Sequence, residues 1–331
     1  RIKGDRADNI ETAISAYTAA LTVFTKEALP VDWAATQNNL AAAYNDRIKG
    51  NRADNIETAI AAYTAALTVF TREEFPVDWA TTQNNLALTY SNRIKGDRAD
   101  NIETAISAYT AALTVRTKKA LPIDWATTQN NLANAYSNRI KEDKVDNIEK
   151  AIAAYSAALT VYTRVEFPVD WAATQNNLAN AYSNRIKGDR ADNIETAISA
   201  YTAALTVRTK EALPVDWAAT QNNLAAAYND RIKGDRADNI ETAIAAYTAA
   251  LTIRTKEALP VDWAATQNNL ANAYSNRIKE DRADNIETAI SAYTAALTVR
   301  TKEALPIDWA ATQNNLANAY SNRIKGDRAD N

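Results

Sequence analysis

The chain has 331 residues, with no Cys, His or Met, and its 37 basic and 40 acidic residues give a formal net charge of −3. This composition excludes disulfides, thiolate or imidazole metal ligands and a histidine general base. Balanced charge also provides no field to attract nucleic acid or an anionic membrane. We therefore expect no cofactor, no metal site, and no nucleic-acid or membrane partner. The compartment stays open between cytoplasmic and extracellular.

The sequence repeats with a period of 46 residues. The string Arg-Ile-Lys-Gly-Asp-Arg-Ala-Asp-Asn begins at Arg1. Close copies begin at Arg47, Arg93, Arg139, Arg185, Arg231 and Arg277, and a partial eighth unit begins at Arg323. A stack of repeats buries a core that grows with each added unit. We therefore expect residues 1–331 to form a single repeat array.

The first element of each unit is predicted to be a helix, over residues 8–26 in the first unit. Asp8 and Glu11 have the spacing of a capping box, in which each side chain accepts from an amide at the helix start. The apolar residues then recur at steps of three and four, which is one face of an α-helix. They are Ile10, Ile14, Tyr17, Leu21 and Phe24.

A second helix is predicted to begin at Pro30, because proline is tolerated in the first helical turn and not deeper. Asp32 lies in that turn, where a carboxylate is favourable. A second apolar stripe follows, made of Trp33, Gln37, Leu40, Ala41, Tyr44 and Ile48. Gly50 stops the helix within a charged turn. Neither helix can bury its stripe alone, so we expect the pairs to stack, with Trp33 and its equivalents mostly buried.

The spacing of small and aromatic residues resembles the tetratricopeptide repeat family. Its signature is matched by Leu40, Ala41 and Tyr44, and then by Ala59, Tyr63 and Ala66. The resemblance implies an all-α, right-handed superhelical solenoid of antiparallel helix pairs that binds other proteins. The unit is about 12 residues longer than the family's 34. The tract from Phe75 to Leu86 also looks like long-period bacterial arrays of this family.

Candidate chemistry is sparse. Asp32 beside Trp33 recurs in every unit, so we interpret it as architecture, and we expect no enzyme activity. The position of Phe24 becomes Arg116, Arg208, Arg254 and Arg300 in other units. We expect these arginines to reach water, and three of them to pair with a Glu three residues on, as Arg208 could with Glu211.

The candidate binding residues are asparagines of the second helix in each unit. In the tetratricopeptide family this helix lines the concave face, where Asn side chains hold an extended peptide, and an amide can both donate and accept. The resemblance therefore implies a peptide-binding site at Asn38, Asn84, Asn130, Asn134, Asn176, Asn180, Asn222, Asn268, Asn272, Asn314 and Asn318. The alternative is that one Asn of the pair caps or bridges neighbouring helices while the other is exposed to solvent. The Lys and Arg of the family's carboxylate clamp have no counterpart at these helix positions.

Two functions remain open. The favoured one is a non-catalytic scaffold that binds a protein or extended peptide along the concave face. The alternative is structural: a filament, or a very long array, formed by end-to-end stacking of units. The first and last units keep the apolar residues of interior units, for example Ile10 and Tyr320, so neither end is a polar cap. The sequence therefore predicts that more units, or further copies of the chain, cover these ends.

Overall fold

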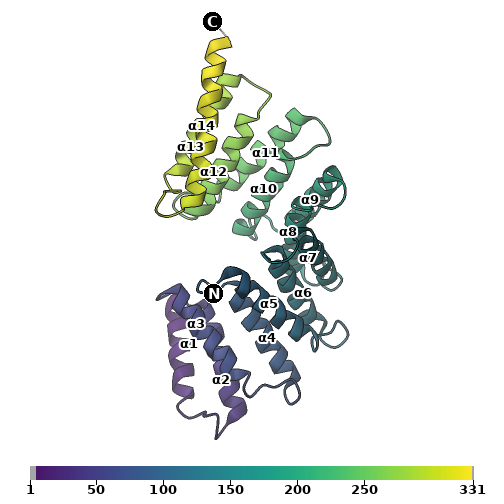
Figure 1. Cartoon of the computed structure of the whole chain (residues 1–331), viewed down its shortest axis with the longest axis vertical. Coiled ribbons are helices and arrows are strands. Elements are labelled where there is room, and N and C mark those ends of the chain that lie inside the picture. The colour runs from purple at the N-terminus through teal and green to yellow at the C-terminus, as the bar shows by residue number, and fades with distance from the viewer. Residues whose placement is uncertain (1–4, 330–331) are drawn as a thin grey trace. The chain divides into compact units, whose positions relative to one another are not determined.

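The computed structural model describes the backbone of residues 5–329 and the side chains of residues 5–323. Within this part of the chain there are fourteen α-helices and no strand (Figure 1). The odd-numbered helices are α1 (Arg6–Ala20), α3 (Arg52–Ala66), α5 (Arg98–Leu113), α7 (Lys144–Ala158), α9 (Arg190–Leu205), α11 (Arg236–Leu251) and α13 (Arg282–Leu297). The even-numbered helices are α2 (Pro30–Asp46), α4 (Pro76–Ser91), α6 (Pro122–Ser137), α8 (Pro168–Ser183), α10 (Pro214–Asn229), α12 (Pro260–Ser275) and α14 (Pro306–Ala329). The predicted all-α fold of one helix pair per 46 residues is confirmed.

The odd-numbered helices begin earlier than the sequence suggested. The N-cap of α1 is Asp5, whose Oδ1 accepts from the Ala7 amide at 2.7 Å. In α3 the N-cap is Asn51, whose Oδ1 accepts from the amides of Ala53 and Asp54. The predicted capping box of Asp8 and Glu11 is therefore wrong, because a better cap lies three residues upstream. The predicted end near Lys26 is also wrong, since α1 ends at Ala20.

The even-numbered helices begin as predicted, with a proline in the first turn and no side-chain cap. The tryptophans of these helices are only half-buried, which corrects the expectation that they form the core. A lysine or arginine lies over most of their rings, as Lys118 does over Trp125 at 5.8 Å. Residues 324–329 continue α14 as helix where the equivalent residues of other units form a turn.

Small residues and tyrosines make the core instead. In α5, Ala105 and Ala112 are fully buried, and Tyr109 is 1% exposed. They pack with Ala87 of α4 and Leu132 of α6. Alanine lets the helix backbones approach closely, so α5 is held between α4 and α6, and α9 is held between α8 and α10. The same cluster recurs at Tyr201 and Tyr247.

The chain divides into two compact units, residues 1–163 and 164–331. In the first, α4 packs against α3 and α5 and also touches α2 and α6. In the second, α10 packs against α9 and α11 and also touches α8 and α12. Within each unit the even-numbered helices therefore form one continuous layer in direct contact.

The charged turn after each even-numbered helix is a repeated connector, illustrated by Arg93. Its Nε and Nη2 donate to both carboxylate oxygens of Glu57, each at 2.8 Å, and its Nη1 donates to Asn101 Oδ1 at 3.3 Å. The guanidinium also lies over the Tyr90 ring, 5.5 Å from its centre. The Glu57 carboxylate thus binds the arginine of the next unit and does not cap the helix in which it lies. This contact explains why the Glu recurs in the repeat although no capping box forms.

The four arginines at the Phe24 position are buried, so the expectation that they reach water is wrong. Arg208 is 8% exposed, and its Nη1 donates to Thr220 Oγ1 at 3.1 Å. Its ion pair is with Asp216, 3.5 Å away at the start of the next helix, and not with Glu211. The turn after α9 folds the arginine back toward α10. In all four units with this arginine, its ion pair is therefore with the Asp that precedes the tryptophan.

Candidate functional site

The asparagines of the Asn38 repeat position form a ladder between successive even-numbered helices. Asn84 is 5% exposed, and its Oδ1 accepts from Thr128 Oγ1 at 3.1 Å and from Asn131 Nδ2 at 3.5 Å. The same helix-to-helix bridge recurs from Asn223 to Asn176 at 3.4 Å. The ladder also includes Asn38, Asn222 and Asn268, which accept from Thr82, Asn269 and Asn315. These amides hold the layer together, as the alternative interpretation of the sequence suggested.

Asn130 is half-buried, and Asn314 is exposed on α14. No following even-numbered helix lies against α14 in this chain, so Asn314 has no successive helix to bridge to. The exposure of a ladder residue therefore depends on the presence of the next unit.

The asparagines of the Asn134 repeat position lie one helical turn further on. They connect an even-numbered helix to the odd-numbered helix that follows it. Tyr155 OH donates to Asn134 Oδ1 at 2.6 Å, and Tyr201 and Tyr293 donate in the same way to Asn180 and Asn272, each at 2.5 Å. These three amides remain partly exposed, and Asn318 is exposed. Burial raises the pKa of Tyr155 to about 12, so the phenol stays protonated and the amide oxygen is its acceptor.

A polar hollow of about 160 Å³ lies between α4 and α6, over Tyr109 of α5. We call it the Arg98 hollow. Its polar lining is Ser91, Asn92, Arg98, Asn131, Asn134 and Asn138. No acidic residue lines it. The site therefore combines one cation with several amides that can donate or accept.

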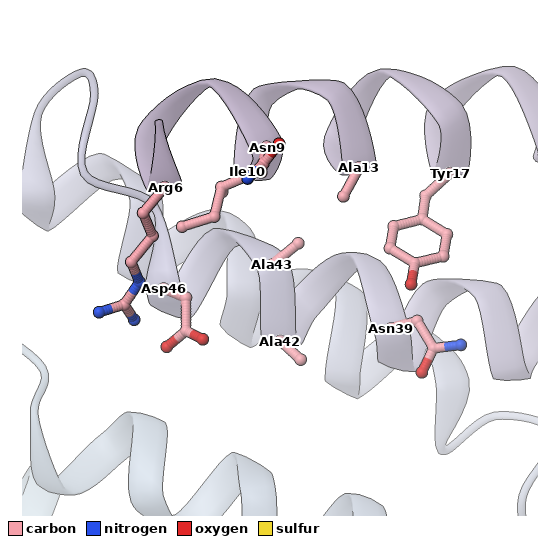
Figure 2. Close-up of a pocket in the computed structure, with 9 residues that line it drawn as sticks. All are labelled: Arg6, Asn9, Ile10, Ala13, Tyr17, Asn39, Ala42, Ala43 and Asp46. Atoms are coloured by element: carbon pink, nitrogen blue, oxygen red, sulfur yellow. The ribbon is translucent and has the colours of Figure 1, made fainter. Parts of the chain in front are cut away.

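Two other hollows are lined by residues at the same repeat positions as the Arg98 hollow. Between α12 and α14, a hollow of about 480 Å³ is lined by Ser275, Asn276, Arg282 and Asn322, each four repeats after its counterpart in the Arg98 hollow, and also by Arg277 and Glu280. At the start of the chain, a more apolar hollow of about 520 Å³ is lined by Arg6 and Asp46, two repeats before Arg98 and Asn138. Figure 2 shows Ile10, Ala13 and Tyr17 of α1 directed toward α2 there.

Arg98 caps the preceding helix, as its equivalents Arg52, Arg190 and Arg236 also do. Arg98 Nη1 donates to the Ser91 carbonyl oxygen at the end of α4, and Arg190 Nη1 donates to the equivalent Ser183 carbonyl. A guanidinium has five N–H donors, so this bond leaves donors to face the hollow. Arg190 uses one of them: its Nη2 lies 3.6 Å from Asp230 Oδ2 on α10.

Buried polar atoms that lack a standard hydrogen bond also gather at one of these repeat positions. In the part of the chain that the structure describes, Ser91 Oγ, Ser183 Oγ and Asn229 Oδ1 are buried and make no hydrogen bond of standard geometry. Ser91 and Ser183 lie beside the buried hydroxyls of Tyr109 and Tyr201. The three atoms without such a bond all stand at one position of the 46-residue unit. Such atoms are rare in folded proteins and call for a water or a ligand.

The polar groups of the Arg98 hollow are hydrogen-bond donors and acceptors. Among residues 5–323 no cluster of three or more carboxylates has the geometry of a metal site. None of the described helices is long and apolar enough to cross a membrane. Of the residues that line the Arg98 hollow, Asn134 was a candidate from the sequence, and Ser91, Arg98 and Asn138 were not. The candidates were all residues of the second helix, whereas Arg98 enters the hollow from the start of the next helix.

No protein-family model matches the chain, and no curated protein matches it either. Solved structures do resemble it. A chain of the APC/C hetero-tetramer Cut9–Hcn1 superposes with a TM-score of 0.61 at 17% identity, over 94% of this chain and 47% of that one. BtubC from P. vanneervenii has a TM-score of 0.55 at 23% identity, over 74% and 91% of the two chains. The assembly chaperone of RpL4, Acl4, has a TM-score of 0.55 at 15% identity, over 83% and 93%.

The chain spans about half the length of the Cut9–Hcn1 chain that it matches. At these identities the likeness shows the fold, which is a tetratricopeptide-repeat-like array of helix pairs.

Proposed function

We propose that the chain is a non-catalytic scaffold that binds extended segments of protein partners across the layer of even-numbered helices. The observation that carries the proposal is the recurrence of polar hollows at one repeat position, between α4 and α6 and between α12 and α14. An extended backbone exposes donors and acceptors on both sides, which suits a row of amides and hydroxyls. The scaffold-type fold is consistent with this function.

In this proposal the two sets of asparagines have different roles. Those of the Asn134 position contact the peptide, because all four are exposed or partly exposed and Asn134 itself lines the Arg98 hollow. Those of the Asn38 position set the spacing between helices, because their amides are bonded across the layer. The ladder therefore keeps the peptide contacts at a fixed interval.

A peptide library displayed on phage and selected against the full chain tests the proposal. The decisive variant replaces Asn134, Asn180, Asn272 and Asn318 with Ala, which the chain itself carries at Ala42 and Ala226. We expect selected peptides to lose at least about tenfold in affinity, since each lost hydrogen bond contributes roughly 1 kcal/mol.

A matched control replaces Ser15, Ser107, Ser199 and Ser291 with Ala, the residue present at Ala61, Ala153 and Ala245. These serines are exposed on the odd-numbered helices. Peptide affinity should be unchanged in this control. Failure to select any peptide, or equal affinity for the Asn variant and the wild type, would contradict the proposal.

A second candidate function is assembly by end-to-end stacking. It is favoured by the hollow beside α1, where Ile10, Ala13 and Tyr17 are partly exposed. Their equivalents in α3 are Ile56, Ala59 and Tyr63, which are at most 1% exposed beneath α2. An even-numbered helix of another 46-residue unit therefore fits the hollow beside α1.

A further inference from the structure

The Arg98 hollow has an internal counterpart that already contains a carboxylate. The repeat two units later has Asp230 where the Arg98 hollow has Asn138. There the Asp230 carboxylate lies 3.6 Å from Arg190, while Arg190 still binds the carbonyl at the end of α8. Arg98 binds the carbonyl at the end of α4 in the same way but faces an uncharged amide. The two sites differ in this carboxylate, and also in Asn180 and Ala226, which stand where the Arg98 hollow has Leu88 and Asn134.

The carboxylates nearest to Arg98 in sequence are already engaged. Asp97 is the N-cap of α5 and accepts from the Asp100 amide at 2.9 Å. Asp100 accepts from Lys141 Nζ at 2.6 Å. Arg98 itself is exposed, so a carboxylate from outside the chain can reach its remaining N–H groups.

The other groups of the hollow suit the same ligand. The Ser91 hydroxyl is buried beside the hydroxyl of Tyr109, and Asn138 is exposed with an amide nitrogen that donates to the Asn134 carbonyl at 3.0 Å. A hydroxyl and a second amide N–H can donate to a carboxylate beside the guanidinium, and such charge-assisted bonds are the stronger kind.

We propose that the Arg98 hollow, and its counterpart at Arg282, each bind a side-chain carboxylate of an acidic peptide segment. Asp230 occupies the equivalent place beside Arg190 and closes that position to the ligand. The proposal deepens and rests on the proposed scaffold function. It adds that the partners are acidic. The repeats that have Asn at the Asn138 position bind them, and the repeats that have Asp there do not.

The test uses the full chain and two fluorescent peptides, one alternating Glu with Gly and one alternating Gln with Gly, both with amidated C-termini. We expect the Glu peptide to bind and the Gln peptide not to, with binding that weakens as salt screens the charges. The double variant Asn138→Asp with Asn322→Asp places in both hollows the carboxylate found at Asp230. It should weaken binding at least about fivefold, because like charge now meets the ligand.

Two further variants make the result specific. Asp230→Asn opens the Arg190 position and should strengthen binding of the Glu peptide. The double variant Ser107→Asp with Ser291→Asp adds the same charge on the exposed odd-numbered helices and should change affinity less than twofold, roughly, since separated surface charges are screened. Because all these changes are at exposed or partly exposed positions, folding is checked by circular dichroism.

Equal binding of the Gln peptide, or unchanged affinity in the Asn138→Asp and Asn322→Asp variant, would overturn the acidic-ligand inference. A neutral peptide that carries only a free C-terminal carboxylate serves as a third probe, and its binding in place of the Glu peptide would also overturn it. If library-selected neutral peptides bind and depend on Asn134 while the Glu peptide does not bind, the scaffold function stands and this inference fails.

Discussion

At the scale of single residues, the turn between the helices of adjacent units requires a left-handed backbone. Gly50, Gly96, Gly188 and Gly234 have φ between 78° and 80°. Two units carry Glu at the same position, and Glu142 and Glu280 have φ of 67° and 66°. A side chain with a Cβ is strained there, by roughly 1–2 kcal/mol. The chain tolerates the strain because the Arg93-type connector fixes the turn on both sides.

Replacing Glu142 with Gly should therefore stabilise the first compact unit by about 1 kcal/mol, since the strain relieved exceeds the chain entropy that glycine adds. The ion pair lost with Arg139 is long, 3.8 Å, and Glu142 is 63% exposed, so it contributes little. The midpoint of urea unfolding should rise.

The reverse change, Gly96→Glu, is the matched control. A Cβ at Gly96 would meet Arg93 Nη1 at 3.5 Å, an ordinary contact, so only the backbone is strained. The urea midpoint of the Gly96→Glu variant should fall by about as much as that of Glu142→Gly rises. A midpoint that is unchanged in both variants would show that the turn carries no strain.

At the scale of elements, each odd-numbered helix after α1 buries a tyrosine, and this makes the fold sensitive to alkaline pH. Burial raises the pKa of Tyr63, Tyr155 and Tyr201 to about 12, against an unfolded value near 10. The folded state therefore holds these protons more tightly than the unfolded state. The stability that they contribute is complete below about pH 10 and is lost as pH rises to about 12.

The urea midpoint should thus fall steeply over this range, and phenolate absorbance should rise with unfolding. Lysines such as Lys95, whose pKa is raised by its hydrogen bond to Asp54, act in the same direction. Tyr155→Phe separates the two effects, because it removes one buried phenol and should make the pH dependence shallower. The same slope in this variant would assign the effect to the lysines.

The element scale also shows what the sequence could predict. The helix pairs followed from apolar spacing and from Pro30, because both depend on local geometry. The N-cap of α1 was misplaced, since Asp5 and Asp8 are both good caps and only the following turn decides between them. The roles of Glu11, Arg208 and Arg98 could not be predicted, because each contacts a residue of another helix or turn. Asn134, which lines the Arg98 hollow, was a candidate because the resemblance to tetratricopeptide repeats assigns a face to its helix; its role in binding stays a prediction.

At the scale of the whole molecule, the repeat determines what each exposed end can bind. The hollow beside α1 lies between α1 and α2 and shares some repeat positions with the Arg98 hollow, such as those of Arg98 and Tyr109. Among the described residues, no even-numbered helix precedes α1 to cover it. On α14, Tyr320 is 44% exposed and Ile307 is 85% exposed, beyond the last odd-numbered helix. α12 shows how an even-numbered helix of almost the same sequence packs against α13. α14 of one copy therefore has the sequence to fill the hollow beside α1 of another.

We predict that the 331-residue chain associates through these faces as its concentration rises, since contact between two different faces that does not close on itself gives open chains of subunits. Sedimentation velocity measures the association. Tyr17→Glu, which places a charge in the hollow beside α1, should leave a monomer at every concentration, because an uncompensated charge is costly to bury. Ser15→Glu, exposed on the same helix, should associate like the wild type. A wild-type chain that stays monomeric throughout would remove the stacking function and leave the peptide scaffold.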